Sequence, residues 1–367
     1  MVKKGLFVNP QDVDDLVKRN DLQYLFLLGM RSNGKSSAVK ALRLKKFMET
    51  GEKFAYIRRY SSIDMKGYMV ESYFASVPGF DIKEITGGEW EFIKAKNKEL
   101  WLCRYNEEGK VIKGPSCGYY VALSEVEHMK SLNFPGVTSL IFEEVCTEQV
   151  YLDNEVALLF SIASTILRLN AGIVYLISNT ISRICPYFRE FGLDKIYGAK
   201  VGDVQIYEYD TTKIGVWLTS EGVEDGEIVT KESDKMFFGS RAKMIKKGEW
   251  DRDDHRKLED RYSMYKPLYT MVFEFHEHKF LMQYMSHIEK KNTHIWYVSP
   301  KNTDTQKRTR LISNVDLEND LATCGFIPLT ENERRIFQQL VNKKIAFSDA
   351  LTGTEFYQCY KQMQAEA

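Results

Sequence analysis

The eight residues from Gly29 to Ser36 constrain the fold of this 367-residue chain more than any other segment. They match the pattern Gly-x-x-x-x-Gly-Lys-Ser/Thr, whose glycines let backbone N–H groups turn inward around phosphate oxygens. The apolar run 22–28 precedes the motif, and helix-forming residues 36–50 follow it up to Gly51. A buried strand, this loop and a helix, in that order, predict a phosphate-binding loop.

The predicted loop is expected to bind ATP together with Mg²⁺. Lys35 would place its charge at the β- and γ-phosphates, and the Ser36 hydroxyl would ligate Mg²⁺. The guanine-recognition pattern Asn-Lys-x-Asp is absent from the sequence, which argues against a GTPase. We expect further nucleotide contacts from Gly29, Arg31, Ser32, Asn33, Gly34 and Ser37.

Charge and cysteine usage limit the partners and the compartment that we expect. The sequence has 51 basic and 51 acidic residues, so DNA would have to be bound by local loops rather than by a general positive field. The six cysteines lie far apart without a C-x-x-C pair, which is typical of reduced cytosolic thiols. The sequence has no signal peptide and no apolar stretch near ~18 residues, so we expect no membrane contact.

Strand-like and helical segments alternate from residue 22 to about residue 195, which predicts an α/β fold with a parallel sheet. A β meander interrupts this alternation over 85–123, and apolar residues repeat at helical spacing over 151–169. The four parallel strands are expected at 22–28, 54–59, 137–142 and 172–178.

The character of the sequence changes after this region, and the length favours two domains. A hairpin over 203–218 and an acidic, turn-like stretch resemble a connection rather than a core. Two β-rich runs over 268–285 predict another hairpin, with a third strand at 295–299 and a helix from Thr330 to about Lys344. His276 and His278 lie in the turn of the hairpin over 268–285, and we expect neither of them to bind a metal ion. The expected divisions are an ATPase domain at 1–195, a linker at 196–235 and a second domain at 236–367.

Two acids end the predicted strand that starts at Val137. We expect Glu143 to ligate Mg²⁺ and Glu144 to act as the base that polarises the attacking water. Most strands of this kind carry Asp at the first of these two positions. The alternative to a catalytic role for the two acids is a strand that runs into a solvated acidic turn. A base for water favours hydrolysis over a simple kinase reaction.

Polar residues after the neighbouring elements complete the predicted site. Asn179 ends the strand at 172–178, where it would contact the γ-phosphate or the water, or else merely begin a turn. Arg168 ends the predicted helix and is our choice for an arginine that acts on the neighbouring subunit's nucleotide. Capping of its own helix is the alternative, and Arg183 and Arg189 are the other candidates.

Basic residues near the predicted nucleotide edge are the candidate DNA contacts. Arg58 and Arg59 end the strand at 54–59, and Lys66 lies in the loop after it. Arg58 and Arg59 could instead contact nucleotide or acids, and the loop with Lys66 could simply be solvated.

Together these motifs resemble the DNA encapsidation ATPases of small podophages with protein-primed genomes, which are related to the terminase large subunit. The resemblance is good over 1–195. It rests on Gly29–Ser36, Tyr56-Ile-Arg-Arg59, Gly118–Ser124, Ile141-Phe-Glu-Glu144 and Ile177-Ser-Asn-Thr180.

The resemblance implies a RecA-like additional-strand P-loop ATPase domain in a homomeric ring, usually a pentamer, at the portal of a viral prohead. ATP hydrolysis would move double-stranded DNA into the prohead in the host-cell cytoplasm. A structural RNA is a further partner that the resemblance leaves open.

For the second domain the resemblance implies a smaller α/β domain with a vestigial RNase H-like nuclease fold. Its first strand offers only Glu274, whereas two-metal cleavage needs several converging carboxylates. An active nuclease that uses Glu274 with Asp316 or Asp320, as in a terminase, remains an alternative. A capsid-independent DNA helicase and a nucleotide-dependent switch are the others.

Overall fold

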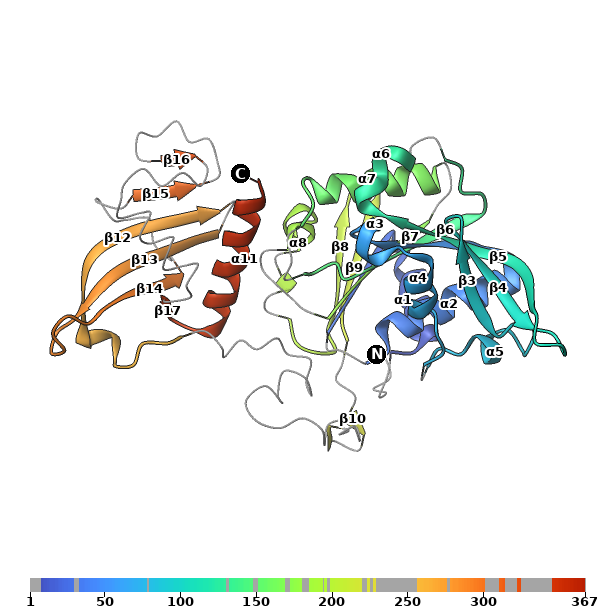
Figure 1. Cartoon of the computed structure of the whole chain (residues 1–367), viewed down its shortest axis with the longest axis horizontal. Helices are drawn as coiled ribbons and strands as arrows, with labels where there is room; N and C mark the ends of the chain where they lie inside the picture. Colours follow the sequence, from blue (N-terminus) through green and yellow to red (C-terminus); the bar gives the residue numbers. More distant parts are fainter. Residues whose placement is uncertain are drawn as a thin grey trace. The chain divides into compact units, whose positions relative to one another are not determined.

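The computed structural model divides into two compact units, one within residues 1–249 and the other mainly at 250–367 (Figure 1). It describes residues 8–29, 33–77, 79–129, 132–147, 151–168, 172–179, 185–193, 195–196, 199–219, 223–224, 227–228, 256–275, 278–300, 310–313, 322–324 and 345–366. No helix within these ranges is both long and apolar enough to cross a membrane.

A nine-stranded sheet of order β3-β4-β5-β2-β6-β7-β1-β9-β8 forms the first unit (Figure 1). The strands run parallel from β5 to β9 through the centre of the sheet. One strand, β7, lies between β1 and β6, so the two expected nucleotide motifs are separated by an additional strand. The four predicted strands are confirmed as β1 (Tyr24–Leu28), β2 (Lys53–Arg58), β6 (Val137–Glu143) and β7 (Ile173–Ser178).

Both edges of this sheet are antiparallel. The predicted meander forms one edge as β3 (Phe92–Lys96), β4 (Glu99–Tyr105) and β5 (Val111–Ala122). The hairpin of β8 (Val204–Tyr209) and β9 (Thr212–Leu218) forms the other.

The β8–β9 hairpin changes the division expected at 1–195, 196–235 and 236–367. It falls within the expected linker, yet β9 pairs with β1 from Tyr24 opposite Ile214 to Leu28 opposite Leu218. The first sheet therefore extends past residue 195. The local pattern showed a hairpin correctly, but it carried no information about a pairing with a strand so distant in the sequence.

Helices cover both faces of the first sheet. Leu25 and Leu27 pack in one core with α1 and α2, whereas Phe26 points to the other face and contacts Phe188 of α8. Two covered faces explain the consecutive apolar residues of β1. The helices are α1 (Pro10–Asn20), α2 (Lys35–Thr50), α3 (Ser61–Asp64), α4 (Gly67–Tyr73), α5 (Ile82–Ile85), α6 (Val126–Met129), α7 (Glu155–Leu167) and α8 (Pro186–Glu190).

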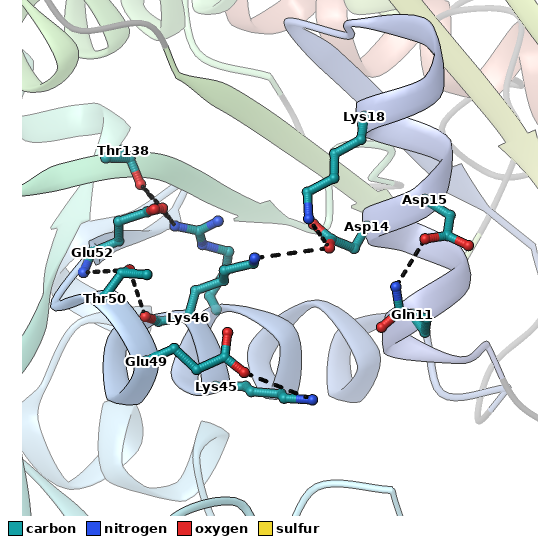
Figure 2. A network of polar contacts seen from close by, with 11 residues as sticks. Gln11, Asp14, Asp15, Lys18, Lys45, Lys46, Glu49, Thr50, Glu52 and Thr138 are labelled. Atoms are coloured by element: carbon teal, nitrogen blue, oxygen red, sulfur yellow. Dashed lines mark hydrogen bonds and ion pairs between the residues drawn. The ribbon is translucent and has the colours of Figure 1, made fainter.

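The ends of α1 and α2 have clear local causes. Asn9 caps α1 by accepting from the Gln11 amide, and Gly51 ends α2 in the left-handed conformation at φ 78°. Figure 2 shows Lys46 of α2 directed toward Asp14 of α1, at 3.9 Å. Such a long pair contributes little, so the apolar faces hold the two helices together.

The second unit contains a six-stranded sheet of order β16-β15-β12-β13-β14-β17. The expected hairpin and third strand are confirmed as antiparallel β12 (Tyr265–Phe275), β13 (His278–His287) and β14 (His294–Pro300). Parallel pairing adds β15 (Arg310–Ser313) beside β12, β16 (Ala322–Cys324) beside β15, and β17 (Ile345–Phe347) beside β14.

The long helix α11 (Ala350–Glu366) packs on this sheet (Figure 1). Its Phe356 contacts Phe273 of β12 and Phe280 of β13 in an aromatic core. The helix predicted from Thr330 to Lys344, and His276, lie outside the described residues. The remaining short elements are β10 (Val223–Glu224), β11 (Glu227–Ile228) and the 3-10 turns Leu123–Glu125 and Tyr262–Met264.

Candidate nucleotide-binding site

The phosphate-loop motif lies between the end of β1 and the start of α2. Gly34 adopts the left-handed conformation at φ 83°, and Gly29 has φ 148°. A Cβ on Gly29 would lie 2.4 Å from Thr219 Oγ1, so this position also requires glycine for space. Of the expected nucleotide contacts, Arg31 and Ser32 lie outside the described residues.

Lys35 is buried at the first position of α2. Its Nζ donates to Asn33 Oδ1 at 2.9 Å and to the Gly29 carbonyl at 3.1 Å, so the side chain lies back along the loop. Burial lowers the pKa of Lys35 to about 7, while the charge of Glu143 acts in the opposite direction. Ser36 and Ser37 follow in the first turn of the helix, both half-buried.

Asn33 connects the loop to the end of β9. Its Nδ2 donates to Thr219 Oγ1 at 2.5 Å, and that hydroxyl donates to the Leu28 carbonyl at 2.9 Å. The loop is thereby attached to the strand that the sequence had placed in the linker. This attachment could not be foreseen, because Thr219 lies 186 residues from Asn33.

Glu143, at the end of β6, is buried among cationic and hydroxyl groups. Lys40 Nζ lies 2.9 Å from its Oε1, the Tyr56 hydroxyl donates to Oε2 at 2.6 Å, and Arg58 lies 3.6 Å away. Burial raises the pKa of this carboxyl, but Lys40, Tyr56 and Arg58 together outweigh burial, and the pKa is lower than usual. Glu143 is therefore an ionised oxygen donor, of the kind that Mg²⁺ prefers.

Glu144 differs from its neighbour in both exposure and backbone. Its side chain is 58% exposed, and its Oε2 lies 2.9 Å from Arg58 Nη2. Its φ of 61° is in the left-handed region, which costs a non-glycine residue about 1–2 kcal/mol. Such a conformation persists only where the surroundings hold it.

Arg58 and Arg59 are candidate DNA contacts from the sequence, with contacts to acids as an alternative, and in the structure both contact acids. Both are buried, with Arg58 paired to Glu144 and Arg59 to Glu155 at 2.7 Å. Buried guanidinium groups need carboxylate partners, and the sequence did not reveal which acids supply them. Lys66 is exposed just before α4, and a DNA contact there stays a prediction.

Asn179 lies where the sequence placed it, directly after β7. The register pairs Leu28 with Ser178 and Glu143 with Ile177, so Asn179 follows at the edge of the sheet where the phosphate loop and the two acids begin. Its side chain is half-buried. The sheet thus brings the three predicted motifs to one edge.

Arg168 ends α7 as an exposed residue with φ 48°. Its guanidinium donates to the Leu132 carbonyl at 2.9 Å and to the Thr165 carbonyl at 3.3 Å. These contacts match the helix-capping alternative, and a role in a neighbouring subunit stays a prediction. Arg189 is also exposed, whereas Arg183 lies outside the described residues.

Four residues of the site could not be recognised from the sequence. Lys40 and Tyr56 contact Glu143, Glu155 pairs with Arg59, and Tyr187 donates to Glu155. The one available signal was a charged residue within the apolar face of a helix, as at Lys40. Within the described ranges, no cluster of three or more His, Cys, Asp or Glu residues lies close enough to hold a metal ion.

Comparison with known proteins agrees with this arrangement. The model of the family "Podovirus DNA encapsidation protein (Gp16)" matches residues 2–211. The chain belongs to this encapsidation-protein family. The matched region contains the phosphate loop, both acids, Asn179 and Arg168.

Similar proteins extend the encapsidation-protein match along the chain. The DNA packaging protein of Bacillus phage B103 is 24% identical over 355 residues, which cover 93% of this chain and 97% of that protein. The DNA packaging protein of Bacillus phage phi29 is 30% identical over 194 residues, 52% of this chain and 51% of that protein. A chain of the bacteriophage Phi-29 viral genome packaging motor assembly has a similar fold, with a TM-score of 0.53, 20% identity and coverage of 98% and 100%.

Proposed function

We propose that this encapsidation protein is an ATP-driven motor that moves double-stranded viral DNA into a preformed prohead. The observation that carries the proposal is the single sheet edge at which Lys35, the pair Glu143 and Glu144, and Asn179 meet in a chain of this family. The protein would act in the host-cell cytoplasm as a homomeric ring, in our proposal a pentamer, on the viral portal.

The residues of this edge divide the work of ATP hydrolysis. The phosphate loop orients the nucleotide, with Lys35 at the β- and γ-phosphates and the N–H groups of the first turn of α2 directed at phosphate oxygens. Ser36 and Glu143 would hold Mg²⁺, which neutralises phosphate charge when bound. The hydroxyl and the ionised carboxylate suit such a hard cation, since burial has not neutralised Glu143.

Glu144 accepts a proton from the attacking water in this proposal, and Asn179 orients that water or the γ-phosphate. The Glu144 carboxylate is exposed, and its ion pair with Arg58 limits how freely it turns. Hydrolysis thus depends on how Arg58 holds this carboxylate.

Replacing Glu144 by Gln tests the hydrolytic role. Loss of a general base typically costs about 10²–10⁴ in rate, so Glu144→Gln should bind ATP normally and hydrolyse it at least ~100 times more slowly. ATP binding and phosphate release would be measured on the full chain with DNA and proheads. Glu208→Gln is the control, since Glu208 is exposed on β8. Wild-type turnover in Glu144→Gln would exclude Glu144 as the base.

Arg168 is proposed to stabilise transition-state charge at the nucleotide of the neighbouring subunit. Mixing Arg168→Ala subunits with Lys35→Ala subunits should restore some active sites, because a mixed interface can combine an intact Arg168 with an intact Lys35. Steady-state hydrolysis would be measured across mixing ratios. Unchanged low activity at every ratio would leave Arg168 as a helix cap only.

The second unit is proposed to have an RNase H-like fold that has lost nuclease activity and docks to portal, DNA or a structural RNA. Three antiparallel strands flanked by parallel β15 and β16 support this fold, since that order is typical of RNase H-like domains. Glu274 lies on β12, whereas Asp316 and Asp320 lie outside the described residues. Mn²⁺-dependent cutting of DNA that Glu274→Ala abolishes would overturn the proposal in favour of a terminase-like motor-nuclease.

Dependence on the prohead distinguishes a packaging motor from a capsid-independent helicase. We expect DNA to become protected from external nuclease only when protein, ATP and proheads are all present. DNA-stimulated hydrolysis with strand separation in the absence of proheads would instead support a helicase.

A further inference from the structure

Arg59 is the centre of a buried polar cluster next to the proposed base. Its side chain is only 5% exposed, and its guanidinium forks onto Glu155, with Nε 2.7 Å from Oε2 and Nη2 2.8 Å from Oε1. The same guanidinium donates from Nη1 to the Glu144 carbonyl at 2.9 Å and from Nη2 to the Val145 carbonyl at 3.0 Å. Arg59 therefore binds the backbone on the C-terminal side of the base.

Glu155 is held as firmly as Arg59. Its side chain is 0% exposed at the start of α7, and its carboxylate also accepts from the Leu152 amide at 2.9 Å and the Tyr187 hydroxyl at 2.7 Å. Tyr187 comes from α8 and is itself buried. A carboxylate that also accepts from Leu152 and Tyr187 keeps the arginine fork in one orientation.

The backbone that Arg59 binds is the segment in which Glu144 adopts its left-handed conformation. The position of the Glu144 carbonyl depends on the ψ angle of Glu144, and the position of the Val145 carbonyl depends on the orientation of the peptide group that carries it. Two hydrogen bonds from one rigid guanidinium therefore limit both rotations. The direction of the Glu144 side chain follows from this backbone geometry.

We propose that Arg59, oriented by Glu155 and Tyr187, is a positioning residue that holds the Glu144 backbone in its left-handed conformation and so aims the carboxylate at the water attacking ATP. This inference rests on the proposed ATPase function of Glu144. It also gives Arg59 a role inside the site.

Arg59 also joins β2, β6 and α7, so a purely structural role has to be separated from positioning. A buried ion pair can often be replaced by apolar side chains of similar size without loss of stability. The double variant Arg59→Met/Glu155→Met would thus remove the two carbonyl contacts while leaving no buried charge. If Arg59 is purely structural, this variant should hydrolyse ATP at a near-wild-type rate. If Arg59 positions the base, turnover should be low.

Arg43 provides a matched control at the opposite end of β6. It is a buried arginine whose Nη2 donates to Glu52 at 2.9 Å and to Thr138 at 2.7 Å. Figure 2 shows these two partners, Glu52 and Thr138, close together. Arg43→Lys and Arg59→Lys both keep a positive charge and lose the planar fork. Of these two arginines, only Arg59 contacts the proposed base Glu144.

The experiment measures thermal unfolding, affinity for a non-hydrolysable ATP analogue and kcat of the full chain with DNA and proheads. We expect kcat to fall at least ~10-fold in Arg59→Lys and in the double variant, with analogue affinity within about 2-fold, since misplaced catalytic groups cost rate rather than binding. Arg43→Lys should lower the unfolding temperature and keep kcat within about 2-fold.

Near-wild-type kcat in Arg59→Lys, or in a folded double variant, would overturn the inference. If neither variant folds, Glu155→Gln decides, because it keeps the size of the side chain but turns an amide donor toward the guanidinium. A reduced kcat with normal analogue affinity supports positioning there, and an unchanged kcat rejects it. A wild-type chain that hydrolyses no ATP would contradict the proposed function instead.

Discussion

Replacing Lys40 by Met should destabilise the first unit, because Glu143 would stay buried without its nearest cation. Lys40 Nζ lies 2.9 Å from the carboxylate, and both side chains are at most 10% exposed. Lys40 also donates to the Tyr73 carbonyl at 2.9 Å. Methionine preserves most of the side-chain length, so the change removes the charge and the hydrogen bonds with little change in volume.

The expected size of this effect follows from the partners that remain. Breaking one side of a buried ion pair typically costs about 3–5 kcal/mol. Arg58 at 3.6 Å and the Tyr56 hydroxyl at 2.6 Å still compensate the carboxylate, so we expect the lower end of that range. A loss of about 3 kcal/mol corresponds to roughly 6–12 °C in the unfolding temperature of a domain of 150–250 residues.

The penalty should also depend on pH. In the wild type the folded pKa of Glu143 lies below its ordinary value of 4.5, so its ionised form stabilises the fold above that pH and this contribution is lost as pH falls through the folded pKa. Removing Lys40 takes away the largest opposing charge, and burial then raises the pKa. The difference between Lys40→Met and wild type should therefore be largest near pH 8 and shrink toward pH 5.

Thermal unfolding of the full chain without nucleotide and with EDTA, at pH 5 to 8, measures this difference. Lys45→Met is the control on the same helix: Figure 2 shows Lys45 beside Glu49, at 3.9 Å, and Lys45 is 64% exposed. Its loss should shift unfolding by no more than about 2 °C. The double variant Lys40→Met/Glu143→Gln should recover most of the stability.

A shift of less than ~2 °C in Lys40→Met would refute the reasoning, since the ion pair would then contribute no more than an exposed one. An equal shift at pH 5 and pH 8 would show that the loss comes from packing rather than charge.

Two further predictions concern packing in each unit. Gly29→Ala should weaken ATP binding at least ~10-fold in an equilibrium binding measurement, because the new Cβ would clash with Thr219. Its control is Gly51→Ala, at a left-handed turn where no described atom lies within 4 Å of a Cβ. This variant should lower stability by about 1 kcal/mol and leave nucleotide affinity unchanged. Phe356→Ala should destabilise the second unit by about 3–5 kcal/mol in thermal unfolding, and the exposed Leu268→Ala by less than about 0.5 kcal/mol. Wild-type ATP affinity in Gly29→Ala, or equal losses for Phe356 and Leu268, would contradict these expectations.

Several parts of the site could be predicted from the sequence because their cause is local. The motif from Gly29 to Ser36 requires its own backbone path, and the apolar runs on either side determine a strand and a helix. The strand ending at Glu143 and the position of Asn179 after β7 followed from apolar runs ended by polar residues. The hairpin that begins the second unit was recognised for the same reason.

Contacts between distant segments were decided by the tertiary structure alone. The sequence left the partner of Arg59 open between nucleotide, DNA and acids, but Glu155, 96 residues later, makes it a buried arginine next to the proposed base. The hairpin of β8 and β9 belongs to the first sheet because β9 pairs with β1, which no local pattern reports. Side-chain periodicity and backbone preference act over a few residues, whereas burial and charge pairing depend on which segments the fold brings together. The sequence by itself thus determined the phosphate loop and the two acids at the end of β6, and only the fold decided which charged side chains surround them.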